Sequence, residues 1–170
     1  TNGFSGEVPY IIFRYAEALL NYAEAKAELG ELTQADVDLT INKLRARVGM
    51  PNMTLATIRT DPNWPDYGYT LSSALREIRR ERTVELMAEG FRRDDIMRWA
   101  AHKLIIGKRP KGAFYSDELK KAFANLSVDA GNFLDPYKTS LVGAGSTWGF
   151  DPAKHYLLPI PINEMTLNPA

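Results

Sequence analysis

The sequence predicts a mainly α protein made of paired helices and long irregular loops. In several segments apolar residues recur at steps of three and four positions, which is the period of an amphipathic helix. Glycines follow these segments where a left-handed stop is expected. Prolines and glycines fill the stretches between them and oppose a regular helix or a central strand there. The glycine stops are Gly30, Gly49 and Gly90.

The first two predicted helices form a hairpin over residues 10–49. The first helix spans about 11–29, and the second opens at Thr33, which together with Asp36 resembles a capping box. A helix pair of this length corresponds to one tetratricopeptide-type repeat, a unit that needs stacked neighbours to bury its faces. The residues predicted to face the core are Ile12, Tyr15, Leu19, Tyr22, Ala23, Val37, Ile41, Leu44 and Val48.

A second helix pair is predicted over residues 71–105, after a loop at 50–70. Its two helices span about 71–89 and 93–105, at the same three- and four-residue spacing. Trp99 lies at helical spacing with the apolar residues of the second of these helices. We therefore expect Trp99 to belong to the core.

Residues 106–170 are predicted to form an irregular, loop-rich tail. Residues 120–126 favour a short helical turn, and Gly, Asp, Asn and Ser dominate residues 127–147. Residues 155–161 form an apolar run interrupted by prolines, which exclude it from a central strand. We expect this last run to be extended and held against another part of the protein.

Composition excludes several classes of function. Lys plus Arg equals Asp plus Glu at 21 each, whereas nucleic-acid binding requires a concentrated positive surface. The chain has no cysteine, which excludes disulfide and thiolate chemistry. No apolar run approaches the ~18 residues of a membrane-spanning helix. We expect no cofactor, because neither a glycine-rich phosphate loop nor a metal-ligand pattern is present.

Polar residues occupy unusual positions on two of the predicted helices. The first helix carries a polar stripe at helical spacing, and in the third helix Arg82 and Glu85 stand where the apolar stripe should continue. One interpretation is two solvated faces with surface ion pairs. The other is an ion-pair network between the helices, in which Arg14 and Arg82 face carboxylates. The residues of the stripe are Arg14, Glu17, Asn21, Glu24 and Glu28, and the carboxylates of the network would be Glu17, Glu24 and Glu85.

Two loops carry aromatic residues of the kind that bind sugars. Tyr and Trp rings can stack on the apolar C–H face of a sugar while their polar groups form hydrogen bonds. The alternative is that such rings anchor long loops to the body of the protein. The candidates are Trp64, Tyr67 and Tyr69 in the first loop, and Trp148 and Phe150 in the second.

No enzyme site is apparent. Glycoside hydrolysis requires two carboxylic acids about 5 to 9.5 Å apart. The pairs Glu81/Glu85 and Glu85/Glu89 could supply that distance on a helix, but they stand among arginines, which favours structural ion pairs. The two histidines, His102 and His155, are far apart in the sequence.

Four segments, in order, resemble the C-terminal region of the SusD/RagB family. The second and third signatures are Ile41–Gly49 and Ile78–Leu86. The third signature departs from the family pattern where Arg93-Asp94 replace an aromatic pair. The other matching residues are Arg14–Ala25 in the first signature, Glu89-Gly90, Asp95 and Arg98-Trp99 after the third, and Tyr156–Pro161 with Glu164 and Asn168-Pro169 at the end.

This resemblance implies a SusD-like α-α superhelix and a non-catalytic, nutrient-binding lipoprotein. Such proteins form the lid of a SusC-like TonB-dependent barrel transporter at the outer-membrane surface, where they trap an oligosaccharide or sometimes a peptide. Family members are longer, so we expect this chain to be a C-terminal fragment or one piece of a split protein. Its partner would be the N-terminal portion, which carries the lipid anchor.

Two other functions stay open at this point. One is a tetratricopeptide-type scaffold that binds protein partners without nutrient capture. The other, which the residues favour least, is a glycoside hydrolase.

Overall fold

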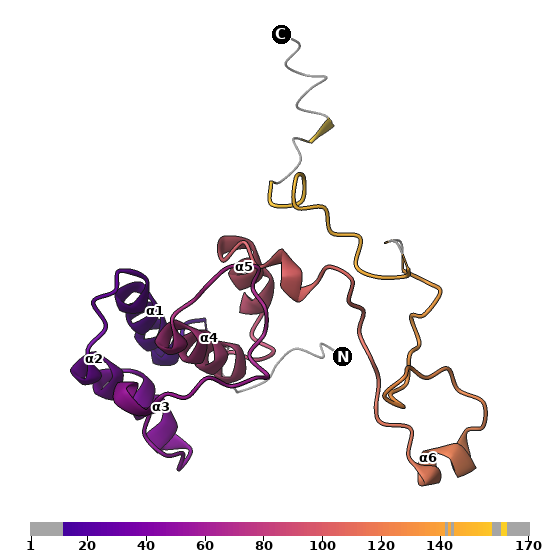
Figure 1. Ribbon diagram of the computed structural model, residues 1–170, viewed down its shortest axis with the longest axis horizontal. Coiled ribbons are helices and arrows are strands. Elements are labelled where there is room, and N and C mark those ends of the chain that lie inside the picture. Colours follow the sequence, from indigo (N-terminus) through magenta and orange to yellow (C-terminus); the bar gives the residue numbers. More distant parts are fainter. Residues whose placement is uncertain (1–11, 142, 144, 158–160, 163–170) are drawn as a thin grey trace, which may run out of the picture. The chain divides into compact units, whose positions relative to one another are not determined.

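The computed structural model describes residues 12–141, 143, 145–157 and 161–162 (Figure 1). They form α-helices, two short 3-10 helices and isolated β-bridges, with no β-strand among these residues. The predicted mainly α fold is therefore confirmed. The chain divides into two compact units, one of Thr1–Trp64 with Thr70–Arg93 and one of Pro65–Tyr69 with Asp94–Ala170. None of the described helices is long and apolar enough to cross a membrane.

Helix α1 (Tyr15–Glu28) begins later than predicted, and its buried face differs from the predicted one. Leu19 and Ala23 are buried as expected, but the prediction for Ile12, Tyr15 and Tyr22 is wrong, because all three are exposed. The buried face is Ala16, Leu19, Leu20 and Ala23. These aliphatic residues recur at steps of three, one and three, so they share one side of the helix.

The exposed side of α1 is also apolar. Tyr15 and Leu29 are each 70% exposed and Tyr22 is 44% exposed. Together with Ala18 and Ala25, which are also exposed, they recur at steps of three and four residues. We call these five residues the outer face of α1. A contiguous apolar face of this kind is typical of an interaction surface.

The predicted second helix is divided in two, α2 (Gln34–Leu39) and α3 (Ile41–Arg47). Of its predicted core residues, Val37, Ile41 and Leu44 are buried, but the prediction for Val48 is wrong, because it follows α3 and is 55% exposed. The chain breaks at Thr40, where φ is −119° and ψ is −87°. The Thr40 hydroxyl donates a hydrogen bond of 2.6 Å to the carbonyl of Asp36, a side-chain bond that bends helices. The predicted capping box at Thr33 is confirmed, and its hydrogen bonds hold the pKa of the Asp36 carboxyl below its ordinary value.

Helices α4 (Ser73–Glu85) and α5 (Phe91–Arg98) occupy the region predicted for the second helix pair, and both are shorter than predicted. Ser72 opens α4 by accepting a hydrogen bond from the Leu75 amide. After α4 the chain turns with a left-handed φ of 66° at Ala88 and 90° at Gly90. The residues that follow α5 form a separate 3-10 helix, η2 (His102–Leu104).

Helices α1, α3 and α4 enclose the core of the first unit (Figure 1). Helices α1 and α4 pack along each other, and α2 and α3 complete the hairpin. The 3-10 helix η1 (Leu55–Thr57) adds partly buried apolar residues. The core residues are Ala16, Leu19, Leu20, Ala23, Val37, Ile41, Leu44, Met53, Ile78 and Leu86.

Trp99 belongs to an aromatic cluster in the second unit. It is 4% exposed, which confirms its predicted place in a core. Its ring lies 5.9 Å from that of Tyr67 in an edge-to-face arrangement. The Tyr69 hydroxyl donates a hydrogen bond to the Trp99 carbonyl. The cluster therefore ties the end of the 50–70 loop to the segment after α5.

A second part of this unit is organised around the buried carboxylate of Asp135. Arg109 donates a 2.7 Å hydrogen bond to it, and the ammonium of Lys111 lies 2.7 Å away. Backbone pairing of Gly112 and Ala113 with Leu134 joins the same two segments.

Two further expectations for the tail differ from the structure. The short helix is α6 (Asp117–Ala122) and starts before the predicted turn at 120–126, because Ser116 caps it. Of the predicted extended run at 155–161, residues 158–160 lie outside the described residues. His155 is held in a turn, because its amide donates to the carbonyl of Asp151 at 2.8 Å.

The ion pairs of Asp135 predict a loss of order at acid pH. The hydrogen bond from Arg109, followed by that from Lys111, holds the pKa of Asp135 far below its ordinary value. A depressed carboxyl pKa stabilises the folded state fully above the unfolded pKa of about 3.9 and progressively less below it. Amide hydrogen-exchange protection at Gly112 and Leu134 should therefore fall as the pH drops below about 4. In Asp135→Asn the protection should be low already at pH 6, without the acid step. Equal wild-type protection at pH 6 and pH 2.5 would contradict the prediction.

Candidate functional site

Helix α4 carries buried positive charge toward α1. Arg79 is 3% exposed, and its guanidinium lies 2.7 Å from Glu28 and 3.7 Å from Glu24, which is also buried. Arg82, 4% exposed, donates a 2.8 Å hydrogen bond to the side-chain oxygen of Asn21. A buried guanidinium is tolerated only where acceptors surround it. The polar residues of α1 therefore face α4 and not solvent alone.

Glutamates of α4 and of the turn after it bind arginines from both arms of the hairpin. Glu85 lies 3.0 Å from Arg14, just before α1, and 2.8 Å from Arg47 of α3. Arg14 also lies 2.7 Å from Glu89, and this contact is the main reason why its pKa is raised. We call this set of contacts, with those of Arg79 and Arg82, the α4 network. It connects α1, α3 and α4 through charge-assisted hydrogen bonds.

The structure brings together most of the charged residues considered from the sequence. Arg14 and Glu85 form an ion pair, and Arg82 donates a hydrogen bond to Asn21. Glu24 lies beside Arg79, a residue that the sequence did not single out. Glu17 forms no side-chain hydrogen bond or ion pair with the described residues. Arg79 could have been found from its position one helical turn before Arg82.

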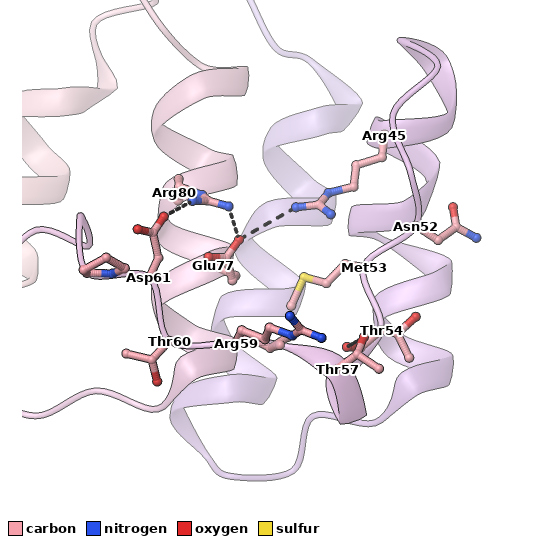
Figure 2. Close-up of a pocket in the computed structure, with 12 residues that line it drawn as sticks. Arg45, Asn52, Met53, Thr54, Thr57, Arg59, Thr60, Asp61, Glu77 and Arg80 are labelled. Atoms are coloured by element: carbon pink, nitrogen blue, oxygen red, sulfur yellow. Dashed lines mark hydrogen bonds and ion pairs between the residues drawn. The ribbon is translucent and has the colours of Figure 1, made fainter.

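A cavity of about 470 Å³ lies beside α4, under the segment that follows α3 (Figure 2). We call it the loop cavity. Sequence reasoning missed it, because it joins residues of α3 and α4 to a loop that carries no motif. Its lining residues are Arg45, Asn52, Met53, Thr54, Thr57, Ile58, Arg59, Thr60, Asp61, Pro62, Glu77 and Arg80.

Two amide side chains hold the wall of the loop cavity in place. Asn42 accepts a 2.7 Å hydrogen bond from the Met53 amide and donates one of 3.1 Å to the Met53 carbonyl. Gln34 accepts from the Leu55 amide at 2.9 Å and also donates to Met53. These bonds satisfy backbone groups that no regular element pairs. The loop that lines the cavity is thus fixed to α2 and α3.

The first group of loop aromatics is partly enclosed. Trp64 is half-buried and donates a 2.7 Å hydrogen bond from its indole nitrogen to Glu77. Tyr67 is 2% exposed, so its ring offers no free face to a sugar in this structure. Tyr69 is partly exposed, while its hydroxyl is bonded to the Trp99 carbonyl. These contacts match the anchoring interpretation more closely than the sugar-stacking one for Tyr67.

In the second group of loop aromatics, one residue is largely exposed and the other packs against a neighbouring ring. Trp148 is 46% exposed, and its backbone amide donates a 3.0 Å hydrogen bond to the Lys108 carbonyl. Phe150 is half-buried, with its ring 5.1 Å from that of Tyr156. Of the five aromatic candidates, Trp148 presents the most ring surface to solvent.

The carboxylates that could have served hydrolysis are engaged in ion pairs. Glu81 lies 2.9 Å from Arg45, and Glu85 and Glu89 both contact Arg14. Glycoside hydrolysis needs two carboxyl groups that are free to contact the substrate, whereas these carboxylates are occupied by guanidinium groups. Within the described part of the chain, no three His, Cys, Asp or Glu side chains are grouped as metal ligands.

Comparisons with known proteins agree on one family. A family model described as the SusD family matches residues 1–170. A solved structure from Bacteroides fragilis, described as a SusD-like carbohydrate binding protein, is 32% identical, with a TM-score of 0.67. The similarity covers 93% of this chain but 28% of that one. No curated protein sequence matches the chain.

Removal of Arg79 should destabilise the first unit strongly. Arg79→Ala leaves the buried Glu24 carboxylate without its guanidinium neighbour, and loss of one partner of a buried pair costs about 3–5 kcal/mol. The free energy of unfolding, measured by urea denaturation, should fall accordingly. Lys26→Ala, which removes an ion pair with the exposed Glu31, is the control and should change it little. The double variant Glu24→Met/Arg79→Met should recover much of the loss. Equal effects of Arg79→Ala and Lys26→Ala would show that the pair does not stabilise the fold.

Proposed function

Because this chain belongs to the SusD family, we propose that the protein captures nutrient glycans at the bacterial outer-membrane surface without changing them chemically. The observation that carries the proposal is the similarity to a solved SusD-like carbohydrate binding protein over 93% of this chain. The four ordered sequence signatures support the same assignment.

We propose a largely structural role for this chain within the whole protein. The α4 network holds α1, α3 and α4 of the first unit together, so that the loop after α3 has a rigid support. Loops carry ligand contacts most often when such a scaffold positions them. Trp148, the most exposed of the five aromatic candidates, is the residue that we expect to stack on a sugar ring.

The resemblance to the family also supports a partner and a location. We propose that the complete protein, anchored by a lipid at its N-terminal portion, covers the extracellular mouth of a SusC-like TonB-dependent barrel transporter. In that arrangement the ligand, a glycan or in some members a peptide, is enclosed between lid and barrel.

The geometry favours binding over catalysis. Each of Glu81, Glu85 and Glu89 lies within 3.0 Å of an arginine nitrogen. Glycoside hydrolysis needs two carboxyl groups that face the scissile bond, whereas these three are occupied by arginines. We therefore propose that no bond is broken in the captured ligand.

A protein-binding scaffold is the second candidate, and the outer face of α1 favours it. Tyr15 and Leu29 are each 70% exposed and Tyr22 is 44% exposed in the described part of the chain. In a tetratricopeptide-like array such a face packs against the next helix pair. This face suits the N-terminal portion of the same protein as well as a separate partner.

Replacement of Trp148 should weaken glycan binding by the complete protein. In affinity electrophoresis the wild type should be retarded by a polysaccharide in the gel. Trp148→Ala should lose much of that retardation, because stacking of one aromatic ring contributes several-fold or more to affinity. Phe123→Ala, which removes another exposed aromatic ring outside the candidate loops, is the matched control. Equal mobility of all three proteins with and without glycans would favour the scaffold, and release of reducing sugar would indicate a hydrolase.

Native mass spectrometry should reveal the transporter. When the protein is extracted in mild detergent from its own membrane, we expect a complex with the N-terminal portion and a large barrel protein. A species of 19.1 kDa alone, soluble without detergent, would contradict the lid assignment. That outcome would not decide whether the protein binds glycans, which the electrophoresis experiment tests.

A further inference from the structure

We propose that the loop cavity binds an acidic sugar and that Arg59 pairs with the anionic group of that sugar. This inference rests on the proposed glycan capture and names the class of ligand. The family similarity extends to carbohydrate binding in general, whereas the charges around this cavity distinguish acidic from neutral sugars.

Most of the charge in the loop cavity is already neutralised. Three arginines and two carboxylates line it. Arg80 lies 3.1 Å from Asp61 and 2.7 Å from Glu77, and Arg45 lies 3.9 Å from Glu77 (Figure 2). Each carboxylate therefore has at least one guanidinium beside it. Arg45 also lies 2.9 Å from Glu81, which does not line the cavity. The third arginine is the one that has no carboxylate of the described residues beside it.

That third arginine is Arg59. Its side chain is exposed and forms no hydrogen bond or ion pair with any residue in the described part of the chain. In Figure 2 it extends toward the other residues that line the cavity. A guanidinium offers a planar fork of donors that matches a carboxylate or a sulfate ester. An acidic sugar would supply the missing counter-charge.

The rest of the lining suits a sugar ring. Thr54, Thr57 and Thr60 bring hydroxyl groups, which hydrogen-bond to sugar hydroxyls. Met53 and Ile58 bring apolar atoms for the C–H face of the ring. The volume of about 470 Å³ falls within the range of about 300–1,000 Å³ that is usual for small-molecule sites.

The cavity is also largely pre-formed. The bonds of Asn42 and Gln34 to the backbone of Met53 and Leu55 fix the loop before any ligand arrives. A wall that is already ordered loses little conformational freedom on binding, which favours affinity.

The test compares two oligosaccharides with the same sugar backbone, one charged and one neutral. Calorimetry with the complete protein would use oligogalacturonate, which carries carboxylates, and its methyl-esterified form, which is neutral. The wild type should bind the acid at least about tenfold more tightly than the ester, the gain typical of a hydrogen bond between charged groups. Arg59→Ala should abolish that preference, and Arg59→Lys should keep part of it. Added salt should weaken the preference in the wild type.

The matched control is Arg93→Ala, which removes another exposed arginine, on α5 and outside the loop cavity. It should bind like the wild type.

A sulfated oligosaccharide that depends on Arg59 in the same way would identify sulfate as the anion, whereas an equal affinity for poly-glutamate would overturn the sugar assignment.

Two outcomes separate this proposal from the proposed function. Equal binding of acid and ester by the wild type and by Arg59→Ala would overturn the Arg59 site and leave glycan capture standing. Unchanged mobility of the wild type in polysaccharide gels, together with no calorimetric binding of either oligosaccharide, would overturn both proposals.

Discussion

Two arginines of α4, Arg79 and Arg82, lie inside the first unit, where a guanidinium must be surrounded by acceptors. Glu24 and Glu28 of α1 face one of them, and Asn21 faces the other. These requirements decide which side of α1 meets α4. The apolar core of Leu20 and Ile78 then fills the space between the helices, but aliphatic contacts alone would allow many registers.

The same helix supports the candidate binding surface. Glu77 and Arg80 of α4 line the loop cavity, and Glu77 also accepts the indole hydrogen bond of Trp64. A change in the position of α4 would therefore move the cavity wall and one loop aromatic together. Arg59 differs from these residues, because it belongs to the loop alone and none of the described residues neutralises it. Stability and ligand recognition thus rest on different arginines of one small region.

Local signals predicted the helices and several of their ends. The capping box at Thr33 is present, and Gly30, Gly49 and Gly90 adopt the left-handed conformation that stops a helix. Periodicity failed where two faces of a helix are both apolar. Tyr15 and Tyr22 have the spacing of core residues, yet they belong to the outer face of α1, whereas the smaller Ala16 and Ala23 are buried. The break at Thr40 was missed, since the bond of its hydroxyl to the Asp36 carbonyl leaves no trace in hydrophobic spacing.

The sequence by itself determined the mainly α class, the family and the presence of polar stripes on two helices, because these follow from the order and spacing of residues along the chain. Only the tertiary structure decided that Arg79 pairs with Glu24, that Tyr67 is enclosed while Trp148 is exposed, and that Arg59 shares a cavity with Glu77. The physical reason is that burial and ion pairing depend on distances between residues far apart in the chain, and packing sets those distances.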